Sequence, residues 1–199
     1  MKKLIFLSLI ISISTFIACG DGQSKNNNET TETSSSEVDV NKLNMNNLLA
    51  EIEKREKAFK GEKTVNHRNG ILLMKAYAAF AERFSNREHA AEYLFKAGEI
   101  AMGAELPVES IRYLDKLYND HPHFEKRAYG LFLKAFVLEN QAQNLDEAKK
   151  TYELFLSEFP AHEMADDALA SIANLGKTPE QIIREFEVRD SIAKANGAV

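Results

Sequence analysis

The sequence has no tryptophan, only one cysteine, and just four prolines and nine glycines among its 199 residues. A single cysteine excludes an internal disulfide framework. Long stretches without proline or glycine favour helices over strands. Clusters of lysine and arginine are also missing, and the net charge of −5 argues against a nucleic-acid partner, which needs a basic surface. These absences leave an acidic, helix-rich chain.

The chain begins with an export signal. Two lysines precede a mostly apolar run from Leu4 to Ala18, which is typical of a secretory signal peptide over residues 1–18. The run is shorter than the ~20 residues that a membrane span requires. The segment 16–20, Phe-Ile-Ala-Cys-Gly, resembles the lipobox of bacterial lipoproteins. That resemblance implies cleavage before Cys19 and attachment of acyl chains such as palmitate to it; the alternative is a plain signal peptide that contains a cysteine.

Residues 19–42 are predicted to form the lipidated cysteine and a disordered tether. The composition from Asp21 to about Asn41 is small, polar and weakly acidic, which is typical of segments that bury no core. The lipoprotein resemblance implies a membrane-anchored protein of the cell envelope. In some bacteria, an acidic residue directly after the cysteine of such lipoproteins is associated with retention in the inner membrane. Glycine follows Cys19 here, so the resemblance favours the outer membrane and leaves the face of the membrane open.

Three later segments are loose copies of one another, at spacings of 37 and 38 residues. They are residues 76–85, 113–122 and 151–160, and the last two end in proline. A large residue occupies the second, fifth and ninth positions of each copy: Tyr77, Phe80 and Phe84; Leu114, Leu117 and His121; Tyr152, Phe155 and Phe159. This spacing puts them on one helical face. Repetition at such a period predicts stacked helix pairs, that is, a solenoid.

Start and stop signals divide the remainder into helices. Asn46 or Asn47 caps the first helix, Asn69 precedes the second, and Thr178 with Gln181 forms a capping box before the last. The expected helices are about 46–60, 70–85, 88–104, 107–120, 124–141, 145–159, 162–175 and 179–195.

The pattern resembles the tetratricopeptide repeat, a 34-residue helix pair with small residues at fixed positions and a proline near its end. A unit that starts at Ala91 places Gly98, Ser110 and Pro122 in register. The resemblance implies an all-α, right-handed solenoid of seven to eight helices in residues 43–199. Its parts would be a degenerate unit at about 45–85, units at 86–123 and 124–161, and a degenerate unit with a polar cap at 162–196.

In this family the first helix of each pair faces a concave groove that binds the partner. The groove positions carried over to this sequence are Phe95, Glu99, Met102, Tyr129, Phe132, Phe136 and Glu139. Their apolar majority favours a protein or peptide segment with hydrophobic anchors. The alternative is that these aromatic residues pack between neighbouring first helices or under the terminal helix.

No motif indicates catalysis. The sequence has no glycine-rich phosphate loop, no nucleophile elbow and no His-Glu-x-x-His pattern. His121 with His123 is a possible metal pair, but it sits in a predicted turn with no third ligand nearby. His162 and Glu163 with Asp166 are a similarly weak candidate, because acidic residues are favoured at a helix start in any case. We therefore expect no enzyme, no catalytic or metal site, no cofactor and no small-molecule substrate.

Two functional hypotheses follow. The first is a membrane-anchored scaffold or adaptor that binds a protein segment in the cell envelope. It is similar in architecture to the lipoproteins that assist outer-membrane protein assembly and to the factor coordinating the Tol–Pal system, which share runs like Tyr-x-x-Phe-Leu-x-x-Phe-Pro at 152–160. The second is a structural spacer or self-associating, homodimerising lipoprotein without a peptide ligand, in which the aromatic row forms the dimer contact.

Overall fold

The computed structural model describes residues 38–61 and 66–197, which belong to one compact unit. In this part of the chain the fold is all-α, with eight α-helices, one short 3-10 helix and no strand. The elements are η1 (Val40–Lys42), α1 (Met45–Lys60), α2 (His67–Arg83), α3 (Ala90–Gly103), α4 (Pro107–Asp120), α5 (Arg127–Asn140), α6 (Leu145–Glu158), α7 (Ala165–Asn174) and α8 (Pro179–Ala195). The predicted signal peptide, Cys19 and most of the predicted tether lie outside the described residues.

Side-chain caps fix several helix starts. The Asn44 side chain accepts from the Asn47 N–H at 2.9 Å, so α1 begins earlier than the predicted cap at 46 or 47. In the same way Asn66, rather than Asn69, caps α2. The predicted capping box before α8 is confirmed. In both helices the side-chain oxygen of the capping asparagine accepts from the N–H of the third helical residue, which has no partner within the helix. The helix therefore starts directly after the asparagine that can form this bond.

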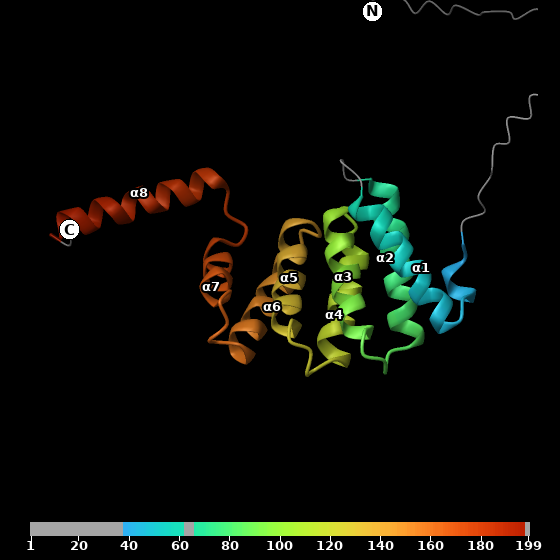
Figure 1. The fold of residues 1–199 in the computed structure, drawn as a ribbon. Coiled ribbons are helices and arrows are strands. Elements are labelled where there is room, and N and C mark those ends of the chain that lie inside the picture. The colour runs from blue at the N-terminus through green and yellow to red at the C-terminus, as the bar shows by residue number, and fades with distance from the viewer. Residues whose placement is uncertain (1–37, 62–65, 198–199) are drawn as a thin grey trace, which may run out of the picture. The chain divides into compact units, whose positions relative to one another are not determined.

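Helices α1 to α7 pack in chain order, each against the next (Figure 1). The predicted helical-repeat fold is confirmed. The repeated large residues at the second and fifth positions occupy the core, as expected from their spacing: Tyr77, Phe80, Leu114, Leu117, Tyr152 and Phe155 are each at most 3% exposed. Those at the ninth position are half-buried. The second helices α4 and α6 therefore bury the faces that carry the copied residues, and the first helices α3 and α5 remain as candidates for binding.

One close approach sets the spacing of α3 and α4. A Cβ atom on Gly98 would lie 2.7 Å from Leu114 Cγ and Cδ2, which is closer than real carbon atoms pack. At the same crossing, the buried Ser110 hydroxyl donates to the Gly98 carbonyl oxygen at 2.9 Å. The α4–α5 crossing repeats the arrangement, because a Cβ on Gly130 would lie 2.8 Å from Leu117 Cδ2. Gly98, which the repeat register predicts as a small residue, lets α3 and α4 touch, and Gly130 does the same for α4 and α5.

The folded unit begins earlier than the sequence indicates. The predicted tether extends to 42, but Val40 is only 7% exposed, and Asp39 caps η1 by accepting from the Asn41 N–H. The Arg83 guanidinium donates to the Val40 carbonyl at 3.0 Å. Two valines, Val38 and Val40, in a polar stretch give too weak a pattern to predict this docking, and the η1 segment belongs to the folded unit.

The C-terminal end differs from the expected polar cap. Helix α7 has ten residues, and Ala168 alone among them is buried. Gly176, at φ 74°, turns the chain into α8, which extends away from the stack (Figure 1) and buries none of its residues. Among the described residues, none of the helices has the length and apolarity that crossing a membrane demands.

Candidate functional site: a groove between the first helices

A hollow of about 390 Å³ lies where α3 and α5 meet the turns that precede α5 and α7. We call it the α3–α5 hollow. Its lining residues are Phe95, Glu99, Glu125, Lys126, Tyr129, His162 and Glu163. It lies at the junction of the two core clusters of the unit, since Tyr129 packs against both.

Aromatic rings form one wall of the hollow. Phe95 on α3 is 3% exposed, and its ring centroid lies 5.9 Å from that of Tyr129 and 6.3 Å from that of Phe124. Tyr129 on α5 is half-buried. Because Phe95 is held on two sides, the Tyr129 ring offers a fixed, partly exposed apolar surface of the kind that anchors interfaces.

Lys126 is held at the rim of the hollow. Its Nζ lies 5.0 Å from the centroid of the Phe95 ring, within the range of a cation–π contact. The same Nζ lies 3.5 Å from Glu92 Oε2 on α3. These two contacts tie the turn before α5 to α3 and place one cation beside the aromatic wall.

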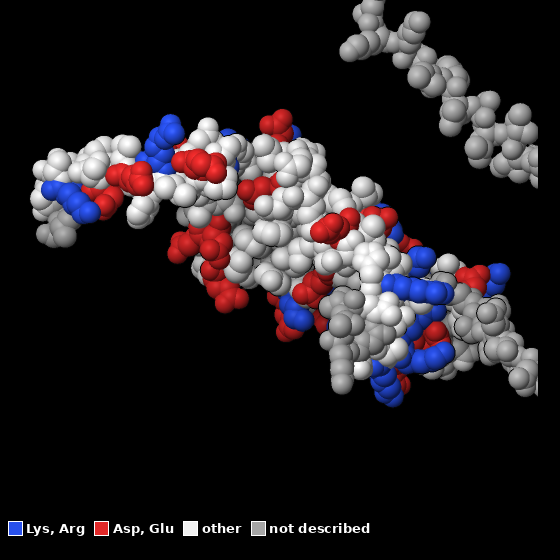
Figure 2. Space-filling view, turned by 90° about the horizontal axis from the view of Figure 1, so that it is seen from above, with Lys and Arg blue, Asp and Glu red and all other residues white. Residues whose placement is uncertain are grey.

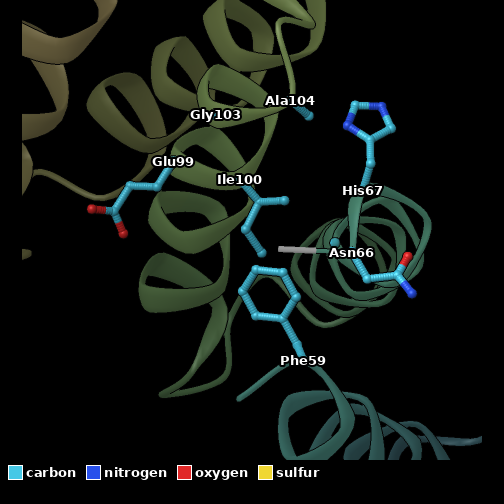
Figure 3. A pocket seen from close by; sticks show the side chains of 8 residues that line it. Phe59, Asn66, His67, Glu99, Ile100, Gly103 and Ala104 are labelled. Carbon is cyan, nitrogen blue, oxygen red and sulfur yellow. The ribbon is translucent and has the colours of Figure 1, made fainter. Parts of the chain in front are cut away.

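Glu99 supplies an acid from α3. The Glu99 side chain is exposed overall, but the surrounding protein partly desolvates its carboxyl and raises the pKa above its usual range, while the positive charge of Lys126 acts in the opposite direction. Figure 3 shows the Glu99 carboxylate directed away from Phe59 and Ile100. The carboxylate therefore points away from the apolar contacts between α1, α2 and α3. A cationic or hydrogen-bonding group of a ligand would offset its desolvation.

A second hollow, of about 340 Å³, lies between α1, α2 and α3. A Cβ on Gly70 would lie 3.3 Å from Phe59 Cε2 and 3.6 Å from Ile100 Cγ2, so the glycine lets α1 and α3 approach across α2. Figure 3 shows the Phe59 ring pointing towards Ile100, with His67 directed outwards. The contacts at Gly70 are apolar packing between three helices, and the lining of this hollow also includes Asn66, His67 and Glu99.

His162 completes the α3–α5 hollow from the turn before α7. Its ring lies edge-on to Phe155, with centroids 5.4 Å apart. The Met164 N–H donates to His162 Nδ1 at 3.2 Å, which makes Nδ1 the acceptor and leaves the proton of the neutral ring on Nε2. With Glu125 and Glu163 at its exposed edge, the hollow combines an aromatic wall with mainly acceptor groups.

Glu99→Gln tests whether the pKa of the Glu99 carboxyl is raised in the folded protein. A raised folded-state pKa means that the folded chain binds the carboxyl proton more tightly than the unfolded chain does. Wild-type stability should therefore rise as the pH falls from neutral towards the ordinary value of 4.5. We expect E99Q to melt higher than wild type at pH 7.5, and this difference to shrink by pH 5. Calorimetry across that range measures it, with exposed Glu153→Gln as the control; a gap that does not change with pH contradicts the expectation.

The structure divides the seven predicted groove residues. Three of them, Phe95, Glu99 and Tyr129, line the α3–α5 hollow. Phe132 instead lies in the core, with its ring 5.7 Å from both Tyr152 and Phe155. For this residue the alternative of packing between helices describes the structure.

The other three lie apart from the hollow. Met102 is half-buried and packs against the larger core cluster, and its carbonyl accepts from Gln141 Nε2 at 2.9 Å. Glu139 accepts a hydrogen bond from the Tyr152 hydroxyl at 2.9 Å, which ties α5 to α6. Phe136 is 40% exposed and is not part of the lining.

Four lining residues were not among the predicted ones: Glu125, Lys126, His162 and Glu163. They come from the turns that precede the first helices, whereas the family pattern assigns groove positions only within the helices. A sequence signal does exist, because each pair stands three or two residues before the alanine that opens a repeat unit, at Ala128 and Ala165. His162 lies beside the Phe155 ring, and Glu163 lines the hollow together with Phe95 and Tyr129.

No family model matches the chain, and no curated protein matches it. Within residues 38–61 and 66–197, no three histidine, cysteine, aspartate or glutamate side chains gather where they could hold one metal ion. A functional proposal has to come from the chemistry of the hollow and from the sequence motifs.

Proposed function

We propose that this chain is a lipid-anchored scaffold of the bacterial cell envelope, of the tetratricopeptide type, whose α3–α5 hollow binds a segment of another protein. The anchor would be Cys19, which lies outside the described residues. The observation that carries the proposal is the hollow itself: two successive first helices and the turns around them leave a partly apolar depression at the groove positions of the repeat register.

The lining indicates what kind of segment would bind. Three carboxylates, from Glu99, Glu125 and Glu163, surround one ammonium group, from Lys126. Glu125 and Glu163 form no ion pair with other described residues, so their charges remain available to a ligand. A segment with an apolar or aromatic side chain next to a lysine or arginine would satisfy both the Tyr129 wall and the acidic edge.

Photo-cross-linking tests the site. Tyr129 is replaced by photoreactive benzoylphenylalanine in cells, and Leu154, which is 39% exposed on α6, is replaced in the same way as the control. We expect a discrete cross-linked protein from position 129 only, and mass spectrometry should place the link beside a basic residue. Equal products from both positions, or none from position 129, would reject the α3–α5 hollow as the binding site.

Charge reversal at the edge should weaken this capture. For Glu125→Lys/Glu163→Lys we expect the cross-link yield at position 129 to fall about tenfold, because both rim charges that attract the segment would then repel it. Glu153→Lys/Glu187→Lys is the matched control, since both residues are exposed and lie outside the lining. Comparable losses in the two double variants would point to net charge rather than to the site.

The anchor has its own test. Mass spectrometry of the mature N-terminus should detect an acylated Cys19, and Cys19→Ser should move the protein from the membrane fraction to the soluble or uncleaved form. Two acyl chains suffice for stable attachment. An unmodified thiol at the mature N-terminus would refute the anchor while leaving the groove proposal standing.

A further inference from the structure

Helix α8 is well formed, but all of its residues stay at least partly exposed. Its 17 residues begin with a capping box, and none of them is buried. Four apolar side chains on it are more than half exposed: Ile183 at 58%, Phe186 at 61%, Val188 at 53% and Ile192 at 54%. Since isolated helices of this length are marginal in water, this exposure indicates a surface that is covered in an assembly.

The sequence of α8 contains one continuous seam. Ile182, Glu185, Arg189 and Ile192 follow each other at steps of three, four and three, which is the spacing of positions that face a partner helix. Val188 and Phe186 flank this seam on its two sides, whereas Ile183, four residues before Glu187, lies on the opposite face of the helix. The face is also hollowed: a depression of about 360 Å³ is lined by Arg184, Glu185, Val188, Arg189 and Ile192.

We propose that the seam binds a second copy of itself, with the two α8 helices antiparallel and a two-fold axis at the level of Glu187. Residues whose numbers add to 374 then lie opposite each other. This places Glu185 against Arg189 of the second copy twice, and Ile182 against Ile192 twice. In this register each charged residue of the seam faces the opposite charge, and each isoleucine faces an isoleucine. Glu187, which would meet its own copy, lies on the far side of the helix.

Charge decides between a second copy and other occupants. An apolar surface would leave Arg189 without a partner and would desolvate the ion pair of Glu185 with Lys177, at a cost in free energy. An anionic lipid surface gains little from α8, because its three basic residues are outnumbered by four acidic ones. Figure 2 shows both signs distributed along this projecting end of the molecule. A self-pairing seam uses both charges.

The seam residues have few competing contacts inside the unit. Glu185 accepts from Lys177 Nζ at 2.6 Å, at an exposed site where a second cation can share the carboxylate. Arg189 lies 5.6 Å from the Phe186 ring and forms no ion pair with another described residue. Arg189 is therefore the cleaner position for a test, because its replacement removes no internal ion pair.

The contact is small, which sets the conditions of the experiment. A helix of this length spans about 25 Å, and a single helix pair buries less surface than a standard stable interface. The dimer should therefore assemble at micromolar concentrations and above. On a membrane, an anchor of the proposed kind would raise the local concentration of copies further.

Sedimentation equilibrium with a charge-exchange set tests the pairing. The protein is residues 19–199 carrying Cys19→Ser, studied over a wide range of concentrations. We expect a concentration-dependent dimer for this parent chain. Arg189→Glu and Glu185→Arg should each weaken dimerisation at least about tenfold, because like charges then face each other twice. An equimolar mixture of the two variants should form a heterodimer, and the double variant should dimerise like the parent.

Each result separates the alternatives. Glu187→Arg is the control for a charge change on the far side of α8 and should leave dimerisation unchanged. Equal melting temperatures across the set, measured at concentrations where the parent is monomeric, verify folding, since no residue of α8 is buried. A parent chain that stays monomeric overturns the proposal, and so does a dimer that persists in R189E. A mixture that fails to pair overturns the antiparallel register. None of these outcomes depends on whether the α3–α5 hollow binds a protein segment.

Discussion

Gly98→Val is expected to lower the free energy of unfolding by about 3 kcal/mol, because the new side chain has no space at the α3–α4 crossing. Its Cβ would lie 2.7 Å from two atoms of Leu114, so the helices must separate. Separation also stretches the buried hydrogen bond from Ser110 to the Gly98 carbonyl. Urea denaturation followed by circular dichroism measures the loss.

Two further variants make the Gly98 result interpretable. Gly103→Ala, on the same helix, places a Cβ with nothing within 4 Å and should stabilise the protein by up to about 1 kcal/mol through helix propensity. Leu114→Ala in the Gly98→Val background removes the obstructing atoms. We expect the two changes to be non-additive by about 1 kcal/mol or more; strictly additive losses would show that the clash is not the cause.

Phe155→Ala should have the other large effect, a loss of about 3–5 kcal/mol. Phe155 is completely buried, and its ring contacts Phe132 at 5.7 Å, Phe159 at 5.8 Å and His162 at 5.4 Å between centroids. Truncation leaves a cavity in the smaller core cluster, where few other side chains can fill it. The same denaturation experiment measures this loss.

The neighbouring residue provides the control for Phe155. Leu154→Ala removes a side chain of similar character that is 39% exposed on the same helix, so we expect a loss below about 1 kcal/mol. The contrast between the two positions reports burial rather than helix propensity. If both variants lost equal stability, α6 would not be packed through its Phe155 face.

The sequence predicted the fold well where its signals were repeated. Tyr77, Leu114 and Tyr152 occur at matching positions of three copies, and periodic evidence accumulates over many residues. The ends of the unit carried no such redundancy. The docking of Val40 depends on one buried side chain and on a hydrogen bond from Arg83, which is 43 residues away in the sequence. A local sequence pattern does not contain information about such a contact.

The site was less predictable for a different reason. Repeat positions specify which side of a helix a residue occupies, and this was enough for Glu99 and Tyr129. They do not specify how far neighbouring pairs are rotated about each other. That rotation decides whether Phe132 points into the core or the groove, and it brings the turn residues Lys126 and His162 to the hollow.

The thin attachment of α7 has a consequence for any occupant of the hollow. With Ala168 as its one buried residue, α7 should open at a lower free energy than α3 or α5, and its amides should exchange with solvent first. His162 and Glu163 stand immediately before this helix, so binding to them is thermodynamically linked to the closed state of α7. Slower hydrogen exchange in residues 165–174 would then report occupancy without any label on the partner.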